Sequence, residues 1–313
     1  DANTTGAYNT GVRFAALSAN TTGERNTAMG YGVGDAITTG NYNTGVGMGA
    51  MGGVTTGDHN TAIGYEALIA ASNTADNNTA VGSSVLYANT TGNNNVAVGS
   101  SALYANTTGE ENIAVGKSAL AAITTNSYCT AVGDRALTVN TAALNTSVGS
   151  LSSFSNTSGT ENTAVGQASL YTNTTGSYNT AVGRYALRLN ETASNNTAVG
   201  YLALTANTTG VQNTAVGSYA LDANTTGTES TALGYDALSA NTTGSYNTGI
   251  GHDALELVTT GSYNTALGRD AGRNITTGSG NICIGPNTND AANTTHVVAI
   301  GDFALSANEA DGN

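Results

Sequence analysis

Small and aliphatic residues alternate in a short step that returns along the whole chain. In its commonest form the step reads Asn-Thr-Ala-Val-Gly, with an aliphatic residue before the Gly and a small residue before that. Neighbouring residues of a strand point to opposite faces, so the step predicts a strand with an aliphatic column on one face and a small-residue column on the other. Thr shares the aliphatic face and is replaced by Val or Ile where it varies, so this face is predicted to be buried.

The step repeats with a nearly constant spacing. Its closing glycines lie 17 residues apart, except for 18 residues from Gly64 to Gly82 and 16 from Gly133 to Gly149 and from Gly285 to Gly301. Counting a first copy in which Arg13 replaces the Gly, the chain holds 18 units with the consensus N-T-A-V-G-x-x-A-L-x-A-N-T-T-G-x-x. The three unusual lengths are interpreted as edits within turns.

Each unit is predicted to form one coil of a parallel β-solenoid. Seventeen residues are too few for a helix pair, and the unit carries β-branched stretches separated by Gly and Asn-Thr-Thr-Gly turn signals. A second strand is expected around the Leu that most units carry. The fold class is therefore all-β, a β-roll of about 18 coils, and the uniform composition predicts one continuous domain over residues 1–313.

Composition indicates that such a coil needs partners. The chain has 41 Gly, 3 Phe and no Trp, so a thin coil filled with Ala and Asn buries little apolar surface against the entropy of ordering its backbone. The strand is therefore predicted to be dry on both sides, one side facing the coil and the other facing further chains, although the pattern leaves open which side turns inward. The residues predicted to form the buried or inter-chain ladder are Val46, Ile63, Val81, Val98, Val115, Val132, Val148, Val165, Val182, Val199, Val216, Leu233 and Ile250.

The repeat resembles the head repeats of trimeric autotransporter adhesins, which carry an N-S-V-A-I-G-like step. The matching segments include Asn78-Thr79-Ala80-Val81-Gly82 and Asn162-Thr163-Ala164-Val165-Gly166. The unit is also similar to repeat arrays of phage tail-fibre-like and bacterial surface proteins. The step here is one residue shorter, and the unit longer, than in the adhesin family. The resemblance implies a homotrimer of parallel β-rolls and an extracellular, cell-surface or virion-fibre location.

Charge argues against several classes of partner. The chain has 21 acidic and 8 basic residues, a formal net charge of -13, so the basic surface that nucleic acid or anionic lipid requires is missing. No apolar run approaches the roughly 20 residues of a membrane helix, and the first residues lack the pattern of a signal peptide. The terminal units carry only weak polar caps, with residues 306–313 the nearest to one, which predicts rods joined end to end.

No catalytic, metal or cofactor site is expected. The three histidines, His59, His252 and His296, lie in different units, and paired carboxylates on adjacent coils are not visible. Cys129 and Cys283 are interpreted as small buried fillers, with contacts between chains as the alternative. The Tyr residues are expected to pack on coil edges rather than to form a sugar-stacking platform. The repeated Asn-Thr-Thr triplets fit both a turn and a glycosylation acceptor, and the sequence leaves this open.

The sequence therefore predicts a non-enzymatic extracellular structural or adhesive fibre, built as a homo-oligomer or filament. The alternative is an ice-binding β-solenoid with columns of Thr, against which we set the expected burial of the Thr beside the aliphatic position. A carbohydrate-degrading β-helix enzyme is the least supported class, because one coil is much like another.

Overall fold

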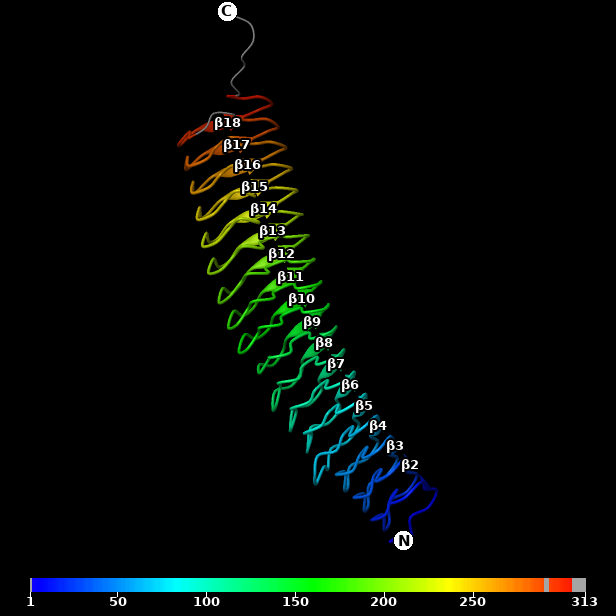
Figure 1. The fold of residues 1–313 in the computed structure, drawn as a ribbon. Helices are drawn as coiled ribbons and strands as arrows, with labels where there is room; N and C mark the ends of the chain where they lie inside the picture. Colours follow the sequence, from blue (N-terminus) through cyan, green and yellow to red (C-terminus); the bar gives the residue numbers. More distant parts are fainter. Residues whose placement is uncertain (1, 290–292, 306–313) are drawn as a thin grey trace, which may run out of the picture. The chain divides into compact units, whose positions relative to one another are not determined.

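The chain forms a parallel β-solenoid in which each repeat makes one coil. The computed structural model describes residues 2–289 and 293–305, so the weak cap expected at 306–313 lies outside the described residues. Strands and turns make up the described part, which contains no helix that could span a bilayer. The chain divides into two compact units, Asp1–Ser158 and Gly159–Asn313, each with nine strands (Figure 1). Whether both units belong to one continuous domain stays a prediction.

Every coil contributes one strand of three residues. The strands of the first unit are β1 (Thr10–Val12), β2 (Thr27–Met29), β3 (Thr44–Val46), β4 (Thr61–Ile63), β5 (Thr79–Val81), β6 (Val96–Val98), β7 (Ile113–Val115), β8 (Thr130–Val132) and β9 (Thr146–Val148). Those of the second unit are β10 (Thr163–Val165), β11 (Thr180–Val182), β12 (Thr197–Val199), β13 (Thr214–Val216), β14 (Thr231–Leu233), β15 (Thr248–Ile250), β16 (Thr265–Leu267), β17 (Ile282–Ile284) and β18 (Val298–Ile300).

Within each unit, consecutive strands pair in parallel and in register. Thr180 pairs with Thr197, and Val182 with Val199, so equivalent residues of successive coils form columns along the stack. The odd-length units keep this register: Thr61 still pairs with Thr79 across the 18-residue interval, and Thr130 with Thr146 across the 16-residue interval. The extra length of the long unit is taken up at Ala71 and Ser72, which are exposed. The prediction of turn edits is confirmed for these two units, whereas the other 16-residue interval contains residues 290–292, which lie outside the described residues.

The expected second strand around the Leu is wrong. This segment is a turn in which the Leu has a left-handed backbone conformation, with φ of 50° at Leu187 and 52° at Leu204. The residue two positions earlier is also left-handed, as at Tyr185 and Leu202. These reversals bring the Leu side chain into the coil, where Leu187 and Leu204 are fully buried. A non-Gly residue in this conformation is uncommon, so the strand propensity of the segment was misleading.

The interior of each coil is filled by the small-residue side of the strand. Ala181, Ala198 and Ala215 are completely buried and pack with the Leu residues of the turns. Where Gly45 replaces this Ala, the freed space is taken by Met51 and Val33, whose side-chain atoms lie 2.5 Å from where a Cβ would be. The interior is therefore narrow, and it accepts a larger side chain only where another is removed.

A ladder of asparagine amides runs through the interior. The backbone N–H of Asn196 donates to Oδ1 of Asn179 in the preceding coil at 3.0 Å, and its Nδ2 donates to the carbonyl oxygen of Gly210 at 2.9 Å. Oδ1 of Asn196 in turn accepts from the N–H of Asn213 at 2.9 Å. Each of these amides thus hydrogen-bonds to buried backbone groups of two coils. These hydrogen bonds compensate for burying polar groups in the interior.

Candidate functional site: the outer face of the sheet

The Thr and aliphatic columns form the outer surface of the sheet in a single chain. Leu233 is 45% exposed and Ile63 41%, and Thr197 and Val199 are half-buried on either side of the fully buried Ala198. The aliphatic face is therefore the outer one in the chain by itself, and its predicted burial would require further chains. The physical reason is size: the buried Leu of the turn and the Asn ladder fill the interior, so the strand directs its small Ala inward and its larger aliphatic residue outward.

The structure places all thirteen predicted ladder residues on this outer face, in line along their units. Four of them are exposed: Ile63, Val148, Val165 and Leu233. The others are half-buried: Val46, Val81, Val98, Val115, Val132, Val182, Val199, Val216 and Ile250. Their burial between chains remains a prediction.

A column of glycines runs beside the aliphatic column and forms a trough. Gly200 has φ of 140°, and a Cβ added there would lie 2.4 Å from the carbonyl oxygen of Gly217 in the next coil. Only Gly fits, because the backbones of successive coils come too close and L side chains avoid this conformation. In unit 1 the trough widens to about 630 Å³ between Met29 and Val46 on one wall and Tyr31 and Met48 on the other.

Aromatic side chains stack from coil to coil at the edges of this face. The rings of Tyr246 and Tyr263 lie 4.8 Å apart and 7° from parallel, and those of Tyr42 and His59 lie 4.7 Å apart at the same angle. The guanidinium of Arg25 lies over the Tyr42 ring at 5.1 Å. Ring faces used in this way are covered by the neighbouring coil, so these columns stabilise stacking. This arrangement favours edge packing over a sugar platform.

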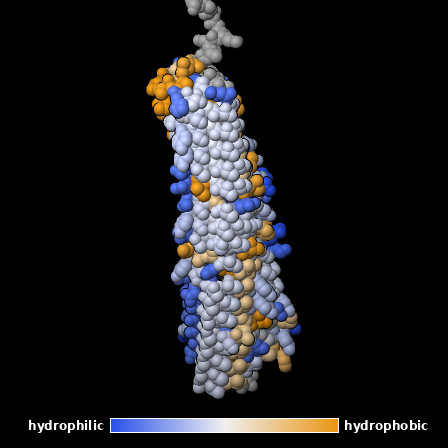
Figure 2. Space-filling view, turned by 90° about the vertical axis from the view of Figure 1, so that its left-hand side faces the viewer, coloured by the Kyte–Doolittle hydropathy of each residue, from blue (hydrophilic) through white to orange (hydrophobic). Residues whose placement is uncertain are grey.

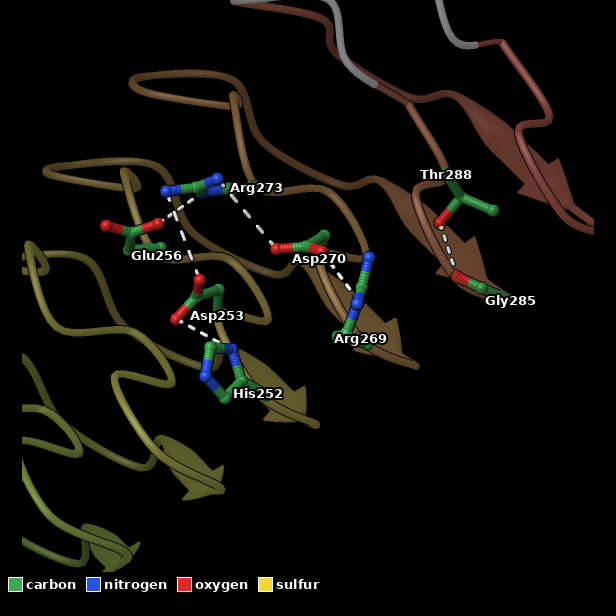
Figure 3. A network of polar contacts seen from close by, with 8 residues as sticks. All are labelled: His252, Asp253, Glu256, Arg269, Asp270, Arg273, Gly285 and Thr288. Carbon is green, nitrogen blue, oxygen red and sulfur yellow. Dashed lines mark hydrogen bonds and ion pairs between the residues drawn. The ribbon is translucent and has the colours of Figure 1, made fainter.

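Unit 2 carries a cluster of charged side chains that was not predicted from the sequence (Figure 3). Asp236, Asp253 and Asp270 occupy the same position of three successive coils, so carboxylates do lie on adjacent coils. Nδ1 of His252 lies 3.1 Å from Oδ1 of Asp253, and Nε of Arg269 lies 2.9 Å from Oδ2 of Asp270. The recurrence of Asp at intervals of 17 residues was the signal that could have revealed this column.

Arg273 joins the cluster across coils. Its guanidinium bonds to the Glu256 carboxylate and lies 3.9 Å from both Asp253 and Asp270. The hydrogen bond to Glu256 raises the pKa of Arg273. One ligand atom each of His252, Asp253 and Asp270 lies within 4.8 Å of the others, but arginines already neutralise both carboxylates. The arrangement fits a network of ion pairs between coils better than a metal centre.

Asp222 is a partly buried carboxylate next to this cluster. Burial raises its pKa from 3.8 to about 6, and the negative charge of Asp236 adds to the shift. The folded state therefore binds a proton more tightly than the unfolded state between about pH 4 and 6. Stability from this group is greatest below pH 4 and falls as the pH rises through 6.

We expect Asp222→Asn to stabilise unit 2 by about 1 kcal/mol at pH 7.5, a figure reduced for solvent screening of a half-exposed group. The gain should shrink toward zero at pH 4, where Asp222 is protonated in both states. Melting temperatures measured by circular dichroism from pH 4 to 8 would show this, with Glu161→Gln as the matched loss of one exposed carboxylate. A gain of equal size at every pH would contradict the assignment.

Both cysteines are free and completely buried, Cys129 in unit 1 and Cys283 in unit 2. Sγ of Cys129 lies 3.2 Å from the carbonyl oxygen of Ala142, and burial raises the pKa of both thiols. Within the chain they are the small fillers that the sequence predicts.

Comparisons with known proteins leave the outer face as the main guide to function. No protein-family model matches the chain, and the search of curated proteins finds no similar sequence. The resemblance to adhesin head repeats thus stays an expectation drawn from the repeat itself.

Proposed function

We propose that this protein is a non-enzymatic structural or adhesive fibre subunit that assembles through the outer Thr and aliphatic columns. The observation that carries the proposal is the line of half-exposed aliphatic side chains, one on every coil, at the same place in the repeat. The exposed half of each of these side chains gains further burial only when another surface covers the column. Contiguous apolar surface of this kind is typical of protein interfaces.

The repetition of the column lets small contributions from many coils add up across one interface. Covering one half-exposed Val contributes on the order of 1 kcal/mol, so nine coils contribute roughly 10 kcal/mol to each unit. This is comparable with the 4–15 kcal/mol that association costs in translational and rotational freedom. A trimer around the outer faces, as the adhesin resemblance implies, covers all columns at once. An extracellular or virion-fibre location belongs to the same proposal.

Apolar side chains are also exposed on the last described coil of unit 2. Figure 2 shows apolar residues gathered at the end where β18 lies, and Val298, Ile300 and Phe303 there are more than half exposed. End-to-end joining of rods is part of the same proposal.

Charging the outer face should separate the subunits. We expect Val199→Lys combined with Leu233→Lys to convert the assembled wild type into monomers in sedimentation velocity, while the far-ultraviolet circular dichroism stays unchanged. Thr209→Lys is the matched control, because Thr209 is exposed in a turn away from the strand. A wild type that sediments as a slender monomer would reject the proposal.

Ice binding is a second candidate, favoured by one specific observation. Thr and an aliphatic residue face outward from each strand in two parallel columns, as at Thr197 and Val199. The earlier objection that this Thr is buried is removed by the structure. An ice-binding face must be free in the active species, whereas a fibre covers it, so the two functions exclude each other. Ice binding would be favoured if the monomeric wild type showed thermal hysteresis and the double variant Thr197→Leu with Thr231→Leu did not.

A further inference from the structure

A hollow in unit 1 lies outside the columns used for assembly. It has a volume of about 390 Å³ and shares Tyr31 and Met48 with the larger hollow beside the glycine column. Its lining includes Tyr31, Asp35, Met48 and Ile69, together with the glycines Gly32 and Gly49. Pockets of this size accommodate small ligands.

Two glycines of the lining are not required by the fold. Gly32 and Gly49 have φ of 60° and 69°, but the equivalent residues of the next two coils, Glu66 and Ser84, adopt the same left-handed conformation with side chains. A Cβ at Gly32 would approach only Asp35, at 3.6 Å, and the nearest atom to one at Gly49 belongs to Ile69, at 3.5 Å. Both are ordinary contact distances. Because Gly32 and Gly49 have no side chains, the hollow stays open.

The lining combines an apolar wall with a single charge. Tyr31 is 54% and Met48 51% exposed, and Ile69 is half-buried. Asp35 is the one charged residue of the lining, and among residues 2–289 and 293–305 no cationic side chain lies within ion-pair distance of it. Burial raises the pKa of its carboxyl, as expected for a carboxylate without a cationic partner.

We propose that this hollow binds a small alkylammonium ligand, whose cationic head pairs with Asp35 and whose alkyl chain lies along Tyr31, Met48 and Ile69. A neutral apolar ligand would desolvate the carboxylate without replacing its hydrogen bonds, which is unfavourable. An anion would be repelled by Asp35 and by the net charge of -13. One ion pair with a short apolar contact in an open hollow corresponds to a dissociation constant of about 1 mM.

The three methionines of the chain allow a site-resolved test. Met48 lines the hollow, Met29 lines only the trough on the sheet side, and Met51 is buried. In full-length protein with ¹³C-methyl methionine, titration with hexylammonium should shift the Met48 signal and leave Met29 and Met51 nearly unchanged. Hexan-1-ol and hexanoate, with the same chain length, should bind at least tenfold more weakly.

Variants separate the charge from the shape of the hollow. Asp35→Asn should weaken hexylammonium binding at least fivefold, and Gly49→Ser, which restores the side chain present in other coils, should weaken it by filling the hollow. Glu111→Gln removes an exposed carboxylate elsewhere in unit 1 and should leave binding unchanged. Equal binding of hexan-1-ol, a shift of Met29 in place of Met48, or full binding by Asp35→Asn would overturn the proposal. Thermal melts of each variant establish that it is folded.

Discussion

Gly200→Ala is expected to lower the free energy of unfolding of unit 2 by at least about 3 kcal/mol. The substitution forces an L side chain into a conformation with φ of 140°, and it places a Cβ 2.4 Å from a backbone oxygen of the next coil. Backbone strain of this kind costs about 1–3 kcal/mol, and the clash cannot be relieved without separating two coils. Guanidinium unfolding followed by circular dichroism would measure the loss in the free energy of unfolding. Hydrogen exchange would show which coils lose protection.

Gly249→Ala is the matched control in the same unit. Gly249 occupies the interior position that is Ala in most coils, and its φ is not in the left-handed region. A Cβ there would lie 3.0 Å from the carbonyl oxygen of Ala254 and 3.3 Å from Leu238, so its neighbours need to shift by only a few tenths of an ångström. Its replacement should change stability by less than about 1 kcal/mol. If the two substitutions proved equally mild, the close approach of the glycine column would not be a determinant of the stack.

Asn196→Ala is expected to cost about 3 kcal/mol. It removes the acceptor of the Asn213 N–H and the donor to the Gly210 carbonyl oxygen, and both groups are buried. A buried polar group left without its partner costs about 1–3 kcal/mol. Local hydrogen exchange should rise at Asn213, whereas coils at the far end of unit 2 should keep their protection, because each coil contacts only its neighbours.

Asn196→Ser provides the comparison that isolates the amide. Ser230 occupies the same column, and its Oγ accepts from the N–H of Asn247 at 3.2 Å. Serine at position 196 should therefore preserve the link to the next coil and cost about 1 kcal/mol. An Asn196→Ala protein as stable as Asn196→Ser would show that the ladder contributes little.

Local pattern sufficed to predict the strands. The strand in every coil ends at the aliphatic residue before the Gly, and Thr163–Val165 or Thr180–Val182 could be assigned from the repeat alone. The glycine column and the asparagine ladder have the same origin: each depends on contacts between equivalent positions of identical neighbours, and a 17-residue spacing places those positions together.

The orientation of the strand could not be read in the same way. A period of two says that Ala198 and Val199 face opposite sides, but neither side carries charge, so the pattern alone left open which of them faces the interior. The deciding quantity was the width of the coil, set by left-handed turns at residues such as Leu202 and Leu204. Residues of high strand propensity gave no sign of these turns. The sequence did not indicate the hollow at Asp35, because the hollow depends on Gly32 and Gly49, at a position where other coils carry a side chain.

The turn at Ala71 and Ser72 has a consequence for how such a protein changes over generations. One surplus residue protrudes there, and the bridge between Val54 and Asn73 and the pairing of β4 with β5 restore the alignment directly after it. Errors in copying a repetitive coding sequence can therefore be absorbed at corners of the coil, and loss or duplication of a whole repeat leaves every remaining neighbour correctly placed. Length is consequently a trait that selection can adjust in steps of about 4.8 Å.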